Sequence, residues 1–155
     1  MKTILFAEDD EVLVMAYRGH LKQAGYSVTL AQDGLETLKH LSMFEPDLLI
    51  LDLMMPKFDG KELLQFISNT PRLANLPVIV LSAKNLVDAE QEQLMKRADR
   101  YLIKQDCTPA ILLAAIQELL KGRFQPRPAV KAVTADDHAP SLIRACQKLS
   151  SNAKN

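Results

Sequence analysis

Polar residues that could act on a phosphate follow several short apolar runs of the sequence. They are carboxylates, a hydroxyl and an amine: Glu8, Asp9 and Asp10 after residues 4–7, Asp52 after 48–51, Ser82 after 78–81, and Lys104 after 101–103. Grouped carboxylates repel one another and need a cation, and their hard oxygen atoms suit Mg²⁺, which often binds a phosphate as well. An aspartate can attack phosphorus to give an aspartyl phosphate, while an amine and a hydroxyl can bind the phosphoryl oxygens. Together these residues predict a phosphoryl-acceptor site.

The apolar runs are expected to be strands that alternate with helices. We predict strands over about residues 2–7, 26–31, 48–51, 78–81 and 101–103, and helices over about 11–24, 35–45, 61–69, 86–97 and 110–121. Strict alternation of this kind predicts an α/β fold, in which a parallel sheet carries helices on both faces. Ligands of such sheets bind beyond the carboxyl ends of the strands. The polar residues should therefore meet at one edge of the sheet.

Composition and charge divide the chain into two parts. The 155 residues are 48% hydrophobic and 25% charged, which is typical of a soluble globular protein. The 19 basic and 19 acidic residues leave no net charge, which argues against a dedicated nucleic-acid-binding protein. The distribution is uneven, since residues 1–122 carry a net charge of −4 and residues 123–155 carry +4. We expect one folded domain over 1–122 and a basic, proline-containing tail over 123–155, a linker in which 141–149 either forms a short docking helix or is disordered.

Several other classes of protein are excluded or disfavoured. Cys107 and Cys146 lack the spacing of a disulfide framework or a zinc site, and we assign them no role. The first apolar run ends at Glu8, which makes it too short for a signal peptide. No stretch has the roughly 18 apolar residues of a membrane span. We therefore expect a reduced, cytoplasmic protein without membrane association.

Four motifs resemble the receiver domains of two-component response regulators, of the chemotaxis type, over about residues 1–122. The motifs are ILFAEDD at 4–10, DLLILDLMMPKFDG at 47–60, PVIVLSAK at 77–84 and YLIK at 101–104. Each is weak alone, but four in this order, each at a predicted strand end, are highly specific. The resemblance implies a flavodoxin-like (βα)5 fold, a doubly wound parallel sheet with strand order 2-1-3-4-5, followed here by the short C-terminal tail.

The resemblance also implies a role for each acidic residue. Asp52 would be the phosphorylated aspartate and also a metal ligand. Asp9 would bind Mg²⁺ directly, and Glu8 would bind it through water. The backbone carbonyl of Met54 would be a further metal ligand, and Asp10 would cap the helix that follows.

Four more residues would bind the phosphate and carry the switch: Ser82, Lys104, Tyr101 and Ala83. The Ser82 hydroxyl and the Lys104 amine would bind the phosphoryl group. Tyr101 would turn inward as the hydroxyl moves, and the small Ala83 would leave room for its ring. Taken singly, Lys104 also fits a surface lysine, Tyr101 also fits a half-buried strand residue, and the acidic pair also fits a solvated helix start.

Two positions depart from the pattern that the resemblance leads us to expect. Gln105 follows Lys104 where the family usually has a proline after a cis bond. Because a cis bond before a residue other than proline costs ~3 kcal/mol, the bond is either trans or strained. Arg97 stands in place of a common glycine before Ala98, which leaves the end of the helix predicted over 86–97 unsettled.

As a receiver, the protein is expected to be a phosphorylation-dependent signalling switch and no enzyme beyond its own phosphorylation and slow dephosphorylation. A histidine kinase or a phosphotransfer protein would donate the phosphoryl group to Asp52 in phosphorelay signal transduction. The phosphate would then reshape the face formed by the fourth helix, fifth strand and fifth helix, which would contact a downstream protein or a second copy of the chain. Since the tail over 123–155 is too short for a helix-turn-helix domain, we expect output by protein contact and no direct DNA binding.

Two alternatives remain open at this point. A phosphorylation-independent interaction module would share the fold, and Mg²⁺-dependent phosphorylation would exclude it. A phosphatase of the haloacid-dehalogenase type also uses a strand-end aspartate. Its usual second aspartate two positions later is Met54 here, which disfavours this alternative.

Overall fold

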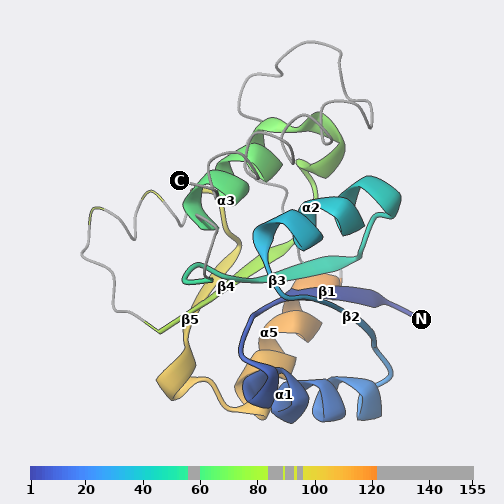
Figure 1. Cartoon of the computed structure of the whole chain (residues 1–155). Coiled ribbons are helices and arrows are strands. Elements are labelled where there is room, and N and C mark those ends of the chain that lie inside the picture. The colour runs from blue at the N-terminus through green and yellow to red at the C-terminus, as the bar shows by residue number, and fades with distance from the viewer. Residues whose placement is uncertain (56–59, 84–88, 90–92, 94–95, 122–155) are drawn as a thin grey trace.

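A five-stranded parallel sheet forms the centre of the protein (Figure 1). The computed structural model describes residues 1–55, 60–83, 89, 93 and 96–121. The strands are β1 (Thr3–Ala7), β2 (Ser27–Ala31), β3 (Leu48–Asp52), β4 (Val78–Ser82) and β5 (Arg100–Ile103). They lie in the order β2-β1-β3-β4-β5, and neighbouring strands are parallel. The predicted strand order and fold class are confirmed.

Helices alternate with these strands along the chain. They are α1 (Glu11–Gln23), α2 (Gly34–Met43), α3 (Gly60–Asn69) and α5 (Pro109–Leu120), with two short 3₁₀ turns, η1 (Pro71–Leu73) and η2 (Lys104–Asp106). Most of the helix predicted over 86–97 lies outside the described residues, although Ala89 and Gln93 are helical. The sequence leaves the end of this helix unsettled, and the structure shows Lys96 and Arg97 in a turn, so the helix does not extend to Arg97.

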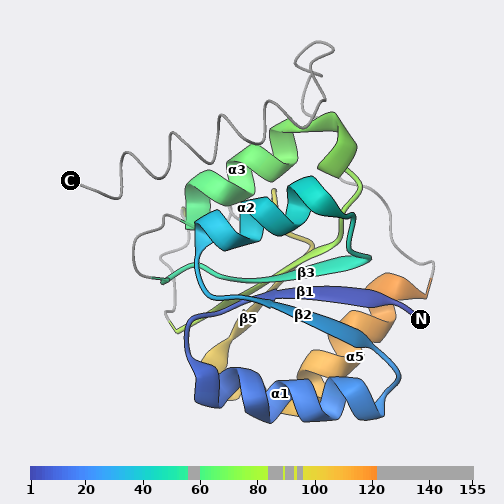
Figure 2. The same ribbon diagram turned by 45° about the vertical axis from the view of Figure 1, so that its right-hand side comes forward.

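The helices cover both faces of the sheet, α2 and α3 on one face and α1 and α5 on the other (Figure 2). All five residues of β3 are buried, and its side chains alternate between the two layers as the period of a strand requires. Leu49 and Leu51 pack in the core beneath α2 and α3, whereas Leu48 and Ile50 pack in the core beneath α1 and α5. The strand that ends in Asp52 is therefore held rigidly from both sides.

Local signals in the sequence explain where α1 starts, ends and packs. Asp10 caps it, since Oδ1 accepts hydrogen bonds from the backbone N–H of Val12 at 3.1 Å and of Leu13 at 3.2 Å. Gly25 follows the helix with a φ of +93°, a conformation that glycine adopts without strain. The buried face of α1 consists of Val14, Tyr17 and Leu21. The helical spacing also predicts Leu13 and Ala24 on this face. Leu13 is half-buried and packs against the same core, whereas Ala24 is exposed beyond the last turn, so the prediction is wrong for Ala24.

Two sequence expectations concern parts of the chain that the structure does not describe. The tail over 123–155, with its helix expected at 141–149 and Cys146, lies outside the described residues. So does the loop at 56–59 after β3. Among the residues that are described, no helix is long and apolar enough to cross a membrane.

Candidate phosphoryl-acceptor site

The register of the sheet brings the predicted site residues to one edge. Ala7 at the end of β1 lies beside Leu51 of β3, so Glu8 and Asp52 follow at the same level. Asp52 in turn pairs with Leu81, one residue before Ser82. Ser82 pairs with Ile103, one residue before Lys104. Parallel strands that end together thus position all four polar residues, as their places at the ends of apolar runs predict.

Three carboxylates form a cluster at this edge. Oxygen atoms of Glu8, Asp9 and Asp52 all lie within 4.8 Å of one another. Glu8 and Asp52 are only 2% and 1% exposed, whereas Asp9 is exposed to solvent. Glu8 is buried because it continues the pairing of β1, with its N–H bonded to the Ala31 carbonyl at 3.0 Å. Asp9 lies beyond the sheet and reaches the same point from outside.

Lys104 neutralises part of this negative charge. Its Nζ lies 2.8 Å from Glu8 Oε2 and 3.1 Å from Asp52 Oδ2. The Lys104 side chain is 19% exposed, so it pairs with two buried carboxylates while keeping access to solvent. Such charge-assisted contacts are stronger than neutral hydrogen bonds, and they fix the ammonium at the point where the carboxylates converge.

Burial and neighbouring charges together shift the pKa values of Glu8 and Lys104. Burial raises the pKa of Glu8 to about 7, an effect that the Lys104 hydrogen bond opposes and the charge of Asp52 reinforces. Burial alone would lower the pKa of Lys104, but the hydrogen bond to Glu8 and the charge of Asp52 outweigh it, so that the pKa of Lys104 is raised. Lys104 therefore stays cationic, and Glu8 changes charge near neutral pH.

Asp52 is held in a fixed orientation by partners on both oxygens. The backbone N–H of Met54 donates to Oδ1 at 2.9 Å, and Lys104 Nζ approaches Oδ2. Met54 is 54% exposed, while Met55 is buried in the core. The chain after β3 is tightly packed as well, because a Cβ on Gly60 would lie only 2.7 Å from the Cα of Leu53. Asp52 thus sits on a rigid strand end with a closely packed residue directly after it.

The other residues that the sequence assigned to the site differ in their burial and in whether the structure tests their roles. Ser82 is buried at the end of β4, Ala83 beside it is exposed, and Tyr101 is half-buried against the core beneath α2 and α3. Their roles in a switch stay predictions. Asp10 caps α1, as expected. The Lys104–Gln105 peptide bond is trans. Of the two alternatives for this bond, trans or strained cis, the trans bond is therefore confirmed.

A contact near the site was not anticipated from the sequence. The hydroxyl of Tyr17 in α1 donates a buried hydrogen bond to the backbone carbonyl of Cys107, just after η2. The only signal was that a tyrosine on the buried face of a helix needs a partner for its hydroxyl. That signal does not reveal which of the distant carbonyls is the partner.

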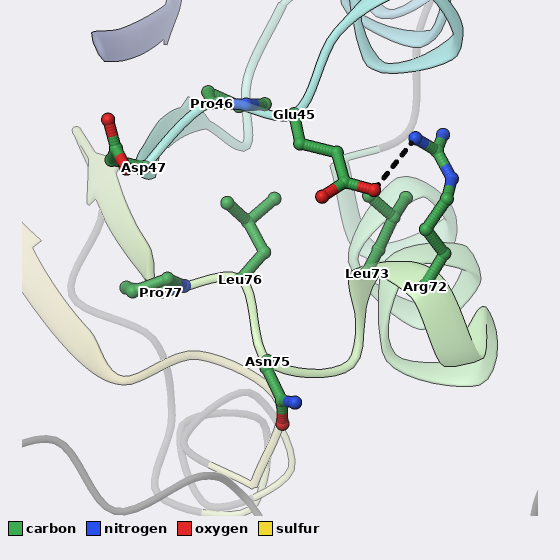
Figure 3. Close-up of a pocket in the computed structure, with 8 residues that line it drawn as sticks. All are labelled: Glu45, Pro46, Asp47, Arg72, Leu73, Asn75, Leu76 and Pro77. Atoms are coloured by element: carbon green, nitrogen blue, oxygen red, sulfur yellow. Dashed lines mark hydrogen bonds and ion pairs between the residues drawn. The ribbon is translucent and has the colours of Figure 1, made fainter. Parts of the chain in front are cut away.

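A hollow of about 220 Å³ lies at the opposite edge of the sheet (Figure 3). It is lined by residues that precede β3 and β4 and by part of η1: Glu45, Pro46, Asp47, Arg72, Leu73, Asn75, Leu76 and Pro77. Arg72 bonds to Glu45 at 3.3 Å and to the Leu41 carbonyl at 2.5 Å. This hollow contains none of the clustered carboxylates, so it is separate from the candidate site.

Comparison with known proteins decides the family. The family model described as "Response regulator receiver domain" matches residues 4–117. The chain belongs to this family. Membership of the response regulator receiver family is consistent with a phosphorylation-dependent signalling switch, and the comparisons give no support to the phosphatase or to the phosphorylation-independent module.

Individual relatives of this receiver domain agree with that result. The response regulator MprA of Mycobacterium leprae is 38% identical over 130 residues, which are 84% of this chain and 55% of that protein. The chain thus spans about half the length of the curated relatives it matches. The receiver domain of the Francisella response regulator 1452 is 30% identical with a TM-score of 0.70, over 78% of this chain and 98% of that one. A signal receiver domain of a histidine kinase from Syntrophus aciditrophicus is 27% identical with a TM-score of 0.72, over 88% of this chain and 99% of that one.

Proposed function

We propose that Asp52 is the residue that accepts the phosphoryl group. The observation that carries this proposal is the position of Asp52: its carboxylate is buried at a strand end, with Met54 N–H on Oδ1 and Lys104 on Oδ2. An Asp52 oxygen would attack phosphorus as the bond from phosphorus to the donor's leaving atom, a histidine nitrogen in a phosphohistidine, breaks. The leaving group takes that electron pair, and the product is an aspartyl phosphate. Hydrolysis of that bond by water would return the domain to rest.

Lys104 is the cation that would bind the transferred group. It already lies between the two buried carboxylates and is partly open to solvent. When the Asp52 charge moves onto the phosphoryl oxygens, the ammonium can follow with little movement. Ser82, at the end of the neighbouring strand, is proposed to donate its hydroxyl to another phosphoryl oxygen.

The carboxylate cluster fits a magnesium ion. Glu8, Asp9 and Asp52 offer hard oxygen donors within 4.8 Å of one another, and one positive charge from Lys104 does not balance three carboxylates. We propose that Asp9 and Asp52 hold the ion together with the Met54 carbonyl, and that Glu8 acts through water. When bound, Mg²⁺ would offset negative charge that builds up during phosphoryl transfer.

The surface around this edge supports a protein as phosphoryl donor. Four of the exposed large apolar residues lie on elements that border it: Val12 and Met15 on α1, Met54 after β3, and Ile111 in the first turn of α5. Val12 and Met15 are 80% and 74% exposed and one turn apart, so they form one apolar strip beside the acidic cluster. We propose that a histidine kinase or a phosphotransfer protein docks over these side chains.

We propose that the signal leaves the domain through β4, β5 and the surface around them. Ser82 and Tyr101 lie on neighbouring strands, where Tyr101 pairs with Val80, so a shift of the hydroxyl toward a phosphoryl group could be passed to the ring, with Ala83 leaving space. A downstream protein or a second copy of this chain would contact the changed surface around β5 and α5. Absence of DNA binding stays a prediction, because the curated relatives extend well beyond the aligned region. A cytoplasmic location also stays a prediction.

Incubation with acetyl phosphate and Mg²⁺, followed by intact-protein mass spectrometry, tests the assignment of Asp52. The wild type should gain one phosphoryl group that hydroxylamine removes, because acyl phosphates react with this amine. Asp52→Asn should take no label. Asp10→Asn is the matched control, since asparagine caps a helix equally well and this residue is outside the cluster. Label that persists in the Asp52→Asn variant would place the acceptor elsewhere.

A further inference from the structure

The loop that carries Lys104 has weak internal support. The turn η2 begins at Lys104 without a side-chain cap, and the backbone bond from Cys107 N–H to the Lys104 carbonyl is 3.4 Å long, beyond the usual range for N–H···O bonds. Gln105 and Asp106 are exposed, and neither restrains its own backbone as a proline would. The position of Lys104 therefore depends on what holds the end of this turn.

Tyr17 holds that end from across the domain. Its hydroxyl donates to the Cys107 carbonyl in a buried bond between residues 90 positions apart. Tyr17 is 3% exposed and Cys107 is 6% exposed, so water does not replace this bond. The Tyr17 ring also packs against Phe6 on β1, with ring centroids 6.1 Å apart. One side chain thus contacts both the strand that leads to Glu8 and the loop that starts at Lys104.

We infer that Tyr17 is a positioning residue for Lys104. The connection runs through three steps: Tyr17 fixes the Cys107 carbonyl, the Cys107 N–H closes the turn on the Lys104 carbonyl, and Lys104 Nζ reaches Glu8 and Asp52. Tyr17 touches none of the reacting atoms, so it acts only through the loop. This inference rests on the proposed phosphorylation of Asp52.

The chemistry of the two partners suits a permanent anchor. Burial raises the pKa of Tyr17 to about 12, so the hydroxyl keeps its proton and remains a donor at any physiological pH. Burial also raises the pKa of the Cys107 thiol, which keeps that side chain neutral beside it. A phenylalanine at position 17 would retain the ring packing and leave a buried carbonyl without its donor.

The test compares Tyr17→Phe with Tyr26→Phe, which removes a hydroxyl from a half-buried tyrosine of the same core. Phosphorylation by acetyl phosphate is followed over a range of acetyl phosphate and Mg²⁺ concentrations. Tyr17→Phe should lower the maximal rate about five- to tenfold, the size expected for one buried hydrogen bond. The apparent Mg²⁺ affinity should stay within about twofold, because the carboxylates keep their places. Tyr26→Phe should change neither quantity.

A double-mutant cycle with Lys104→Ala shows whether the effect passes through the lysine. If it does, Tyr17→Phe should have no further effect on the residual rate once Lys104 is alanine. Leu21→Val, which loosens the same face of α1, should instead reduce the stability without this coupling. An equal loss of rate from Tyr17→Phe in both backgrounds, or a rate equal to that of Tyr26→Phe, would overturn the inference.

Backbone amide NMR separates this inference from the proposed function. The signals of Lys104, Gln105 and Asp106 should shift or broaden in Tyr17→Phe and stay unchanged in Tyr26→Phe. Unchanged signals in Tyr17→Phe would show that the loop does not need the hydroxyl, and the inference would be wrong. A wild type that takes no label from acetyl phosphate would contradict the proposed function, while the NMR comparison would still decide whether Tyr17 positions the loop.

Discussion

Lys104 Nζ lies 3.1 Å from Asp52 Oδ2, although the two residues are 52 positions apart in the chain. The contact joins the ends of two strands that are not neighbours, since β4 lies between β3 and β5. Only a long, flexible side chain can span that separation. The same ammonium also pairs with Glu8 on β1, so Lys104 links three strand ends through their charges.

Replacing Lys104 by methionine should impair both folding and phosphorylation. The variant keeps the bulk of the side chain but leaves Glu8 and Asp52 buried without a cation, which should cost about 3 kcal/mol of unfolding free energy at pH 8 without Mg²⁺. Loss of the donor to the phosphoryl oxygens should slow labelling by acetyl phosphate about a hundredfold. Urea unfolding and mass spectrometry measure the two effects.

The control for this prediction is Lys39→Met, which removes an exposed lysine from α2 and should change neither property. Added Mg²⁺ should restore part of the stability of Lys104→Met, because the ion supplies the missing positive charge and binds only the folded state. Equal stability of Lys104→Met and Lys39→Met at pH 8 would show that the ion pairs of Lys104 do not stabilise the fold.

The raised pKa of Glu8 predicts a pH-dependent effect of Glu8→Gln. The pKa lies near 7 in the folded protein and at 4.5 for an unperturbed glutamate carboxyl, so the folded state binds this proton more tightly than the unfolded state. That contribution to wild-type stability is complete below pH 4.5 and is lost as pH rises through 7. Glutamine resembles the protonated form at every pH. The stability of Glu8→Gln relative to wild type should therefore rise over this window by a few kcal/mol, in order of magnitude.

The measurement for Glu8→Gln is urea unfolding in EDTA at several pH values between 4 and 8.5. Glu62→Gln serves as control because Glu62 is exposed on α3, and its difference from wild type should be small and independent of pH. A flat difference for Glu8→Gln across the window would show that the Glu8 carboxyl titrates normally.

Variants at Asp9 and Asp10 should show whether the carboxylate cluster binds Mg²⁺ or whether negative charge in general attracts the ion. Asp9 is exposed and belongs to the carboxylate cluster, so Asp9→Asn should leave the stability without metal within about 0.5 kcal/mol. It should weaken Mg²⁺ binding about tenfold or more, which corresponds to at least about 1.4 kcal/mol. The rise of Tm with Mg²⁺ concentration reports the affinity.

Asp10→Asn provides the matched comparison at the next position. It removes the same charge but keeps the cap of α1, so the rise of Tm with Mg²⁺ should equal that of the wild type. If both variants lose the response equally, the response reflects general negative charge and not a site formed by the cluster.

The place of the site at one sheet edge could be predicted because it depends only on local patterns. The run 48–51 is apolar at every position, which indicates a strand buried on both faces, and Asp52 follows it directly. Because parallel strands end at the same edge of the sheet, residues that directly follow the strands are expected to lie close together. The same reasoning placed Ser82 and Lys104 correctly.

The finer arrangement depends on contacts between distant elements and could not be predicted. Glu8 and Asp9 are adjacent carboxylates, yet one is buried and one is exposed, because only Glu8 continues the pairing with β2 through Ala31. The bond between Tyr17 and Cys107 requires the exact placement of α1 against the loop after β5. Apolar periodicity specifies which face of α1 is buried but not which carbonyl its tyrosine meets.

Gly60 and Gly19 should respond to alanine in opposite directions. A Cβ on Gly60 would lie 2.7 Å from the Cα and 3.1 Å from the carbonyl oxygen of Leu53, and backbone cannot yield as a side chain can, so Gly60→Ala should cost about 1–3 kcal/mol of unfolding free energy. It should also slow labelling by acetyl phosphate, because Leu53 directly follows Asp52. Gly19 lies within α1, and a Cβ there meets nothing within 4 Å, so Gly19→Ala should stabilise the fold by about 0.5–1 kcal/mol and leave labelling unchanged. Thermal unfolding of both variants measures these effects. A Gly60→Ala variant as stable as the wild type would show that the contact between position 60 and Leu53 is not restrictive.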